Sequence, residues 1–311
     1  MSSAEVMIWQ WQGLDVAWTQ RCIGSSDPSH FATVLIHGFG ASKEHWRHNQ
    51  SVLATIAPCY AIDLLGFGNS SQPQALLKHE THQPGSLGYN FETWGSQVAD
   101  FCRSIAQRPV ILVGNSIGGC VCLRAAQLLG DTCKGVVLIN CAQRQMDDKR
   151  LAEKTRWTRW SRPLLKRMVR QRWLSRTLFR NAAQPHVIRR LLKQVYPSGA
   201  HLDDELVQLL YAPTQRPGAS EAFHGFINLF DDHLASDLMS SQQRPVDLIW
   251  GEKDPWESLE EANQWTESFR CIRSLNVIPD AGHCPHDEAP EKVNAVLIKI
   301  LQGYSSSKIT A

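Results

Sequence analysis

The amino-acid sequence predicts an α/β fold, in which helices cover both faces of a mostly parallel central sheet. Three observations predict it. Short apolar runs typical of buried strands recur along residues 32–62, 110–140 and 245–278. Segments with helical spacing of their apolar residues lie between these runs, and strands that alternate with helices form a parallel sheet covered on both sides. Residues 142–245 have a helical pattern throughout, which predicts an inserted helical cap.

The composition is that of an ordinary globular protein. The 311 residues are 43% hydrophobic and 20% charged, which excludes intrinsically disordered and fibrous classes. The formal net charge is only +2, so we expect no nucleic-acid partner. Nine cysteines without a C-x-x-C pair fit a reducing compartment better than a disulfide framework.

Targeting and membrane-spanning signals are not evident in the sequence. The N-terminal residues lack a basic region followed by an apolar run, and nowhere do about 18 apolar residues follow one another. We therefore expect a protein that is not secreted, and that is cytoplasmic or peripheral on an intracellular membrane.

The first elements along the chain are a hairpin and two buried strands. Residues 7–22 place tryptophans and aliphatic residues around a Gly-Leu-Asp turn, which indicates two strands with one half-buried face. A turn is expected at 25–28, and buried strands are expected at 32–36 and 59–62. Many Pro, His, Gln and Ser residues between 72 and 88 indicate a mobile surface loop.

A serine between glycines follows the most apolar strand of the chain. After a predicted helix at 90–106, the run Val-Ile-Leu-Val at 110–113 leads into Gly114-Asn115-Ser116-Ile117-Gly118 and a predicted helix at 120–129. The pattern G-x-S-x-G between a strand and a helix is a nucleophile elbow, a sharp turn that exposes the serine hydroxyl. Glycines are needed because larger side chains at 114 and 118 would collide with the adjoining strand and helix.

The remaining elements complete the sheet around the insertion. Strands are predicted at 135–140, 245–250 and 274–278, and a final helix is predicted from about 290 to 301. We therefore divide the chain into a core and a cap. The core comprises residues 1–141 and 246–311, and the cap comprises residues 142–245.

The first part of the cap, residues 144–193, is rich in arginine, lysine and tryptophan. Its apolar residues recur at three- and four-residue spacing, which indicates a basic amphipathic helical segment, and two more helices are expected at 201–211 and 219–230. Such a segment has two interpretations. Its tryptophans can lie at the headgroup level of an anionic membrane, which assigns peripheral membrane contact to residues 156–180. Alternatively, the tryptophans and leucines cover the core and the arginines are solvated.

A serine nucleophile needs a histidine to accept its proton and a carboxylate to orient that histidine. His283 opens the loop after the last predicted strand, and Asp254 lies on the turn after the preceding strand. The carboxyl ends of parallel strands are where α/β sheets place their sites. The chain order Ser116, Asp254, His283 is the order expected with a nucleophile elbow. Asp280 is a competing acid, but its place three residues before His283 favours a polar turn residue.

Backbone N–H groups near Ser116 are predicted to bind the negative charge that develops on the substrate oxygen. One is that of Ile117, directly after the nucleophile, and the other is that of Phe39, in the glycine-rich loop after an earlier strand. We interpret His37 as a structural hydrogen-bonding residue, because it lies before this loop rather than on it.

These motifs together resemble the α/β-hydrolase superfamily over residues 31–140 and 245–301. The motifs are His37-Gly38-Phe39-Gly40, Asp63-x-x-Gly66-x-Gly68-x-Ser70, the elbow, Gly251-x-x-Asp254 and Gly282-His283-x-Pro285. A narrower set is similar to pheophytinases and related chlorophyll-dephytylating hydrolases of plastids and cyanobacteria. That set adds Ala41-Ser42, His45-Trp46-Arg47, Gly119 after the elbow, and Asp204-Glu205-Leu206, Tyr211-Ala212-Pro213 and Pro217-Gly218-Ala219 in the cap.

The resemblance implies a serine ester hydrolase without a cofactor. Its small-molecule substrate would be a large, lipophilic ester, from which it removes phytol, as in chlorophyll or pheophytin pigments at a thylakoid-type membrane. The Gly-Asn-Ser-x-Gly-Gly elbow is also similar to that of carbon–carbon bond hydrolases of ring-cleavage products, and that reaction would need a carboxylate-binding arginine in the pocket. A third alternative is a ligand-binding, receptor-like protein with vestigial catalysis. No metal site is predicted, because the dense cluster His283-x-x-His286-Asp287 lacks a third helix-borne ligand.

Overall fold

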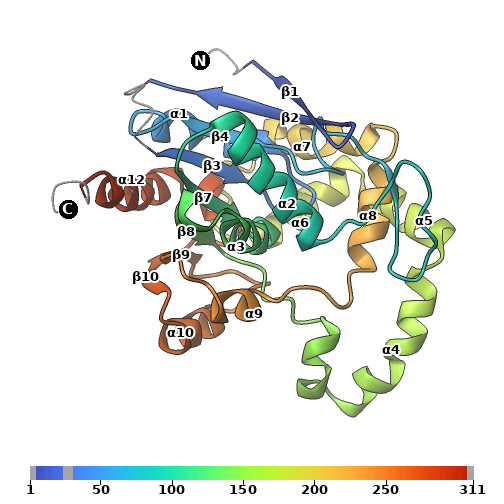
Figure 1. Ribbon diagram of the computed structural model, residues 1–311. Helices are drawn as coiled ribbons and strands as arrows, with labels where there is room; N and C mark the ends of the chain where they lie inside the picture. Colours follow the sequence, from blue (N-terminus) through green and yellow to red (C-terminus); the bar gives the residue numbers. More distant parts are fainter. Residues whose placement is uncertain (1–4, 24–30, 307–311) are drawn as a thin grey trace.

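An eight-stranded sheet runs through the protein, whose computed structural model describes residues 5–23 and 31–306 (Figure 1). The strand order is β1-β2-β4-β3-β7-β8-β9-β10. Neighbouring strands from β4 to β10 are parallel, whereas β2 pairs antiparallel with β1 and with β4. The strands are β1 (Met7–Trp11), β2 (Leu14–Arg21), β3 (Ala32–Ile36), β4 (Cys59–Ile62), β7 (Val110–Asn115), β8 (Cys133–Ile139), β9 (Val246–Gly251) and β10 (Ile272–Ile278). The predicted α/β fold is confirmed.

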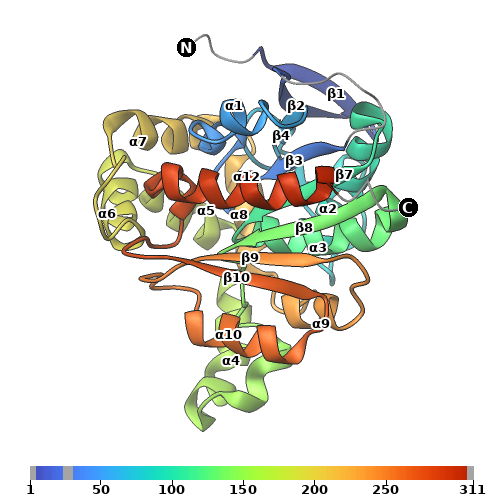
Figure 2. The same ribbon diagram turned by 90° about the vertical axis from the view of Figure 1, so that its left-hand side faces the viewer.

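Helices cover both faces of the sheet, and the alternation of side chains along each strand assigns residues to one layer or the other. In β7, Ile111 and Val113 contact the layer of α1 and α12, whereas Leu112 faces α2 and α3. Figure 2 shows α12 crossing one face of the sheet, with α2 and α3 on the other side. Because β7 is buried on both faces, its sequence is a continuous apolar run. These helices are α1 (Gln50–Leu53), α2 (Phe91–Phe101), α3 (Ile117–Leu129) and α12 (Pro290–Ser306), with α9 (Ala235–Ser240) and α10 (Leu259–Ser268) on the side of α3.

Five helices of the predicted cap follow β8 and precede β9. They are α4 (Arg156–Val169), α5 (Arg172–Ala182), α6 (Pro185–Val195), α7 (Asp204–Tyr211) and α8 (Ala219–Ile227). A small apolar cluster joins α6 and α7 through Leu192, Val195 and Leu206, and it includes Cys284 of the core. In Figures 1 and 2, α4 extends away from the sheet and from α6 and α7. The residue boundaries between core and cap stay a prediction.

Three regions differ in detail from the predicted elements. The helix predicted at 90–106 changes at Cys102 to a π-helical turn, Cys102–Ala106, and the Gln107 that follows has a φ of +52°. The basic segment at 144–193 forms a short 3-10 helix and three α-helices, and Pro185 begins the third α-helix because proline is well suited to the first helical turn. The loop predicted at 72–88 contains a parallel pair of two-residue strands, β5 (Gln74–Ala75) and β6 (Ser86–Leu87). The turn predicted at 25–28 lies outside the described residues.

The shorter helices connect these elements. They are the 3-10 helices Lys43–Trp46, Gly130–Thr132, Asp148–Glu153 and Ala212–Gln215, and the one-turn helix α11 (Pro285–Glu288). None of the helices in residues 5–23 and 31–306 combines the length and the apolar character needed to span a bilayer.

Candidate active site

Ser116 lies at the sharp turn between β7 and α3. Its φ of +55° is in the left-handed region, which a residue with a side chain adopts only under strain. The Ser116 N–H donates to the Ile139 carbonyl at 3.0 Å, and the Ser116 carbonyl accepts from the Ala142 N–H at 3.1 Å. A Cβ at Gly118 would stand 2.4 Å from the carbonyl oxygen of Ile36, so glycine lets α3 begin this close to β3. The serine is therefore held at the end of the sheet by its own backbone.

His283 and Asp254 meet at the carboxyl end of the sheet. Nδ1 of His283 lies 2.8 Å from Oδ2 of Asp254, and their side chains are 5% and 1% exposed. The Asp254 carboxylate also accepts hydrogen bonds from Nδ2 of Asn140 at 2.6 Å and from the backbone N–H of Trp256 at 2.8 Å. Its position and orientation are thus fixed by three donors.

These contacts determine the charge of Asp254. Burial acts to raise the pKa of its carboxyl group, but the hydrogen bonds and the proximity of His283 outweigh burial and lower the pKa. The group is therefore an anion at neutral pH. An anion at this place holds the Nδ1 proton of His283, which leaves Nε2 as the basic nitrogen.

Ser116 and His283 line the same cavity. Within the described residues, no hydrogen bond joins the Ser116 hydroxyl to the imidazole. Such bonds are often long or misaligned without substrate and tighten in the complex. The structure thus brings the three predicted residues into one site, with the acid bonded to the histidine and the serine beside them.

Asn115 and Val195 position the loop that carries His283. Nδ2 of Asn115 donates to the His283 carbonyl at 3.1 Å and to the Ile139 carbonyl at 3.2 Å. The His283 N–H donates to the carbonyl of Val195, the last residue of α6, at 3.0 Å. A helix of the cap therefore contributes directly to the placement of this histidine.

Asn140 is a residue of the site that sequence reasoning missed. Besides its bond to Asp254, its Oδ1 accepts from the Gly251 N–H at 3.0 Å, so it ties the end of β8 to the end of β9. It is fully buried and has a φ of +45°, a conformation that asparagine tolerates better than most residues. Its place at the carboxyl end of a predicted strand, a signal like the one that identified Asp254, could have found it.

The loop after β3 brings Phe39 close to Ser116. A Cβ at Gly38 would stand only 3.2 Å from Cβ of Ser116, so this loop lies against the serine. Among the described residues, no acceptor is bonded to the backbone N–H of Phe39 or of Ile117. Both predicted oxyanion donors are therefore unpaired, and their role in binding an oxyanion stays a prediction. The Phe39 ring stacks on that of Phe226 at a centroid distance of 4.0 Å.

His37 and Asp280 are engaged away from the reacting groups. Nε2 of His37 accepts from the Leu64 N–H at 3.1 Å, and burial lowers the pKa of this histidine. Asp280 forms a surface ion pair with Lys253 at 2.6 Å, and its side chain is 69% exposed. These contacts agree with a structural role for His37 and a polar turn role for Asp280.

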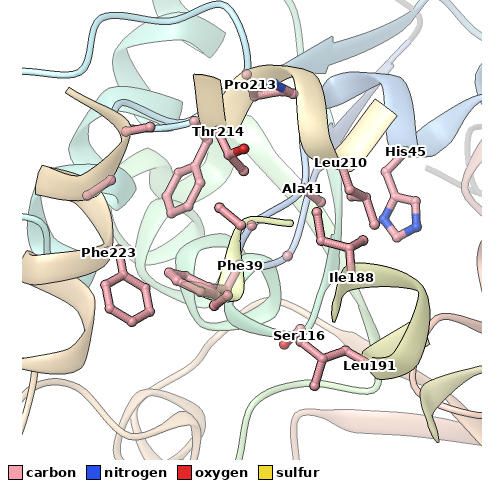
Figure 3. Close-up of a pocket in the computed structure, with 18 of the residues that line it drawn as sticks. Phe39, Ala41, His45, Ser116, Ile188, Leu191, Leu210, Pro213, Thr214 and Phe223 are labelled. Atoms are coloured by element: carbon pink, nitrogen blue, oxygen red, sulfur yellow. The ribbon is translucent and has the colours of Figure 1, made fainter. Parts of the chain in front are cut away.

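The cavity beside Ser116 is apolar. It has a volume of about 330 Å³, and the loop at Phe39 and side chains of α5, α6, α7 and α8 surround it. Figure 3 shows Ile188, Leu191, Leu210 and Phe223 arranged around the serine. Among the described residues, neither arginine nor lysine lines this cavity. The lining is suited to an uncharged, apolar group.

A second cavity, of about 400 Å³, is also lined by Ser116. Phe39, Ser116 and Trp256 line both cavities. Arg144 lines the second one, but its guanidinium already donates to the Asp147 carboxylate at 2.5 Å and to the Leu229 carbonyl at 2.7 Å.

Glu257 lines the second cavity next to Asp254. Burial and the neighbouring carboxylates Asp254 and Glu261 raise the pKa of Glu257 to about 8, although the Gln143 N–H donates to it at 2.8 Å. The carboxyl group is therefore mostly protonated at neutral pH. A neutral acid at this place can donate a hydrogen bond into the cavity.

The cluster that sequence reasoning considered for a metal is engaged in protein contacts. Asp287 accepts from Nε of Arg47 at 2.8 Å and from the Tyr196 hydroxyl at 3.0 Å. His286 is buried, with its ring centroid 4.4 Å from that of Trp46. Among residues 5–23 and 31–306, no three His, Cys, Asp or Glu side chains are grouped so that they could hold a metal ion.

Known proteins share this sequence pattern and this fold. The alpha/beta hydrolase family matches residues 33–296. The chloroplast pheophytinase of Arabidopsis thaliana is 26% identical over 291 residues, which are 86% of this chain and 60% of that protein. The chain therefore spans about 60% of the length of this curated relative.

Two solved structures illustrate the likeness in fold. One is a thermophilic esterase from Thermogutta terrifontis, with a TM-score of 0.69 and 18% identity over 96% of this chain and 99% of the esterase. The other is a serine hydrolase involved in carbazole degradation, with a TM-score of 0.74 and 18% identity over the same shares of the two chains. At this identity, the likeness shows a common fold.

Proposed function

This chain belongs to the alpha/beta hydrolase family, and from that premise we propose that it is a serine hydrolase that cleaves a large apolar carboxylic ester. One observation carries the proposal. Ser116 and His283 open into an apolar cavity without arginine or lysine, and His283 is bonded to an ionised Asp254. These are the groups that acyl transfer from an uncharged ester requires.

The first half of the proposed cycle forms an acyl-enzyme. Oγ of Ser116 attacks the ester carbonyl carbon while Nε2 of His283 accepts the serine proton. The N–H groups of Phe39 and Ile117 bind the resulting oxyanion, and each such donor lowers the barrier by about 2.7–4 kcal/mol. The carbon–oxygen bond to the alcohol then breaks, and the imidazolium gives its proton to the leaving oxygen.

The second half releases the acid. A water molecule gives a proton to Nε2 of His283 as its oxygen attacks the acyl carbon. The bond from the acyl carbon to Oγ of Ser116 breaks, and the proton returns to the serine. The enzyme is regenerated without a cofactor.

The substrate that we propose is a phytyl ester of a chlorophyll or pheophytin pigment. Two observations support it: the cap and elbow motifs resemble those of pheophytinases, and the relative from Arabidopsis thaliana carries that name. The apolar cavity suits a long branched alkyl chain.

Cleavage of a carbon–carbon bond in a dienone acid is the alternative activity. That reaction would need a cation beside the serine to bind the substrate carboxylate. The described residues place no arginine or lysine in the apolar cavity, and Arg144 in the second cavity is already paired with Asp147. The geometry therefore favours the ester.

Replacement of the nucleophile tests the proposal. We expect Ser116→Ala to keep the fold, because Ser116 is held by backbone hydrogen bonds, and to lose essentially all hydrolysis of pheophytin, chlorophyll and p-nitrophenyl esters. A fluorophosphonate probe should label the wild type and not this variant. A wild type that is neither labelled nor active would favour the ligand-binding alternative, and turnover of a dienone acid without turnover of esters would favour carbon–carbon cleavage.

A further inference from the structure

Helix α4 turns its apolar side away from the protein. Trp157, Trp160, Leu164 and Met168 lie three or four residues apart and so form one row along the helix. They are 72%, 74%, 61% and 48% exposed, and the two tryptophan rings lie 5.4 Å apart. We name these four residues the apolar row. Scattered exposed apolar residues need no explanation, but a contiguous row with two tryptophans marks an interaction surface.

The opposite side of α4 is polar, and it is the side that packs against the protein. Arg162 is buried, its Nε donates to Asp148 at 3.0 Å, and its guanidinium lies over the Phe230 ring at 4.4 Å. Lys166 pairs with the same carboxylate. The helix is therefore oriented by its cations, and the interpretation in which its tryptophans cover the core does not describe α4.

Arginines flank the apolar row. Arg156, Arg159 and Arg167 each directly precede a member of the row, so each lies about 100° around the helix from it. All three are exposed, and none forms an ion pair among the described residues. Exposed tryptophans beside unpaired arginines are the combination found on helices that lie in the headgroup region of anionic bilayers.

We propose that the apolar row of α4 and its flanking arginines dock the protein on the surface of an anionic lipid bilayer. A second copy of the chain is a poorer occupant, because a symmetric contact would bring two sets of unpaired arginines together. The bilayer supplies both the apolar layer for the row and the anionic groups for the arginines.

Docking through α4 would also determine how a substrate in the bilayer reaches the cavity. This step rests on the proposed function. Helix α5 follows α4 directly, exposes Trp173 by 68% on its outer side, and lines the cavity with Phe179 and Ala182. Leu191 of α6 lines the same cavity and is 43% exposed. A lipophilic ester dissolved in the bilayer would thus reach the cavity along α5, the helix that leads from α4 to the cavity.

Flotation with lipid vesicles tests the docking independently of catalysis. We expect the full chain to float with vesicles of phosphatidylcholine and phosphatidylglycerol, much less with phosphatidylcholine alone, and less as salt is raised. Trp157→Ser with Trp160→Ser should reduce binding at least about tenfold, and Arg156→Gln with Arg167→Gln should reduce it about fivefold for each arginine removed. Ser116→Ala should bind like the wild type.

Two matched double variants serve as controls. Lys134→Gln with Lys299→Gln removes two exposed cations outside α4, and Ile8→Ser with Ile23→Ser removes two exposed apolar side chains. Both should bind like the wild type. The proposal would be overturned if the control and α4 variants lost binding equally, or if binding did not depend on lipid charge. It would also be overturned if the protein formed a dimer in lipid-free solution and the tryptophan changes dissociated that dimer. Vesicle binding by a protein without esterase activity would uphold the docking and refute the proposed function.

Discussion

Asp254 and Asp280 both lie on loops beside His283, yet their surroundings differ in every physical respect. Asp254 is buried and accepts from His283, Asn140 and the Trp256 N–H, so its charge is directed at the imidazole. Asp280 is exposed and paired with Lys253. At the scale of single residues, the site depends on where a carboxylate is desolvated and which donors hold it.

The two aspartates form a matched pair for mutation. We expect Asp254→Asn to lower kcat by about 10³–10⁴, because an amide cannot hold the Nδ1 proton in the required tautomer. Asp280→Asn should change kcat by about twofold or less, because an exposed ion pair contributes little. Steady-state hydrolysis of a p-nitrophenyl ester measures both. Similar losses in the two variants would contradict the assignment of Asp254.

Glu257 gives the stability of the protein a pH dependence. Its pKa is about 8 in the folded protein and near 4.5 when unfolded, so the folded state keeps a proton that the unfolded state loses. The stabilisation of the folded state by this protonated carboxyl group is fully present below pH 4.5 and is lost as the pH rises to about 8. In the wild type, we expect this group to lower the free energy of unfolding by on the order of 2–4 kcal/mol between pH 5 and pH 9. Glu257→Gln keeps an acceptor for the Gln143 N–H but cannot ionise, so it should not show this decrease.

Thermal unfolding at both pH values measures this difference. Glu260→Gln, an exposed change on the same stretch of chain, is the control and should unfold like the wild type at each pH. If the Tm of Glu257→Gln falls with pH as steeply as that of the control, the buried carboxyl group is not the cause.

At the scale of elements, a single arginine joins three of them. Arg47 follows the 3-10 helix Lys43–Trp46, and its guanidinium donates to Asp287 of α11, to the His201 carbonyl and to Asp203 at the start of α7. The Asp287 side chain is fully buried, so Arg47 neutralises a charge that water cannot reach. These hydrogen bonds of Arg47 therefore link the core to the cap near the loop of His283.

Removal of this arginine should be costly. We expect Arg47→Met to lower the free energy of unfolding by about 3–5 kcal/mol, because Asp287 would remain as an uncompensated buried charge. Arg103→Met is the matched control: Arg103 pairs with Asp100 at 2.9 Å on the surface, and its loss should cost about 1 kcal/mol or less. Urea denaturation of both variants, with equal m values, decides whether burial accounts for the difference.

At the scale of the whole molecule, the cavity exists only because core and cap enclose it together. The core supplies Phe39, Ser116 and His283, and the cap supplies the apolar side chains opposite them. We therefore expect the cap to determine selectivity for substrate size, and the core to determine which bond of the substrate is cleaved.

Leu191 and Leu178 test this division. They are 43% and 45% exposed, but only Leu191 lines the cavity. We expect Leu191→Arg to raise KM for long-chain p-nitrophenyl esters by at least about tenfold, because a charge would meet the alkyl chain, and to leave acetate hydrolysis nearly unchanged. Leu178→Arg should affect neither. A parallel loss with acetate would show damage to the reacting groups instead.

The sequence predicts the sheet, and it singles out Ser116, Asp254 and His283, which the structure brings together, because both inferences depend on local patterns. The continuous apolar run of β7 and the glycines around Ser116 are local patterns that can be recognised without knowing any contact between distant segments. The ends of predicted strands likewise locate the loops of Asp254 and His283. Contacts between distant segments are not readable in this way. The bond from Asn140 to Asp254 spans 114 residues, and helical spacing in α4 shows an apolar row without showing which side faces out.

The hydrogen bond from the His283 N–H to the Val195 carbonyl bears on how this protein could be re-engineered. Grafting a foreign cap into an alpha/beta hydrolase treats the two parts as separable modules. Here the carbonyl of Val195, the last residue of α6, accepts a main-chain hydrogen bond from the proposed general base, and no side-chain change can replace a carbonyl group. A chimaera would therefore need to keep the end of α6 and its junction with the loop at Gly282, whereas α4 lines neither cavity at Ser116 and places no such constraint on the site.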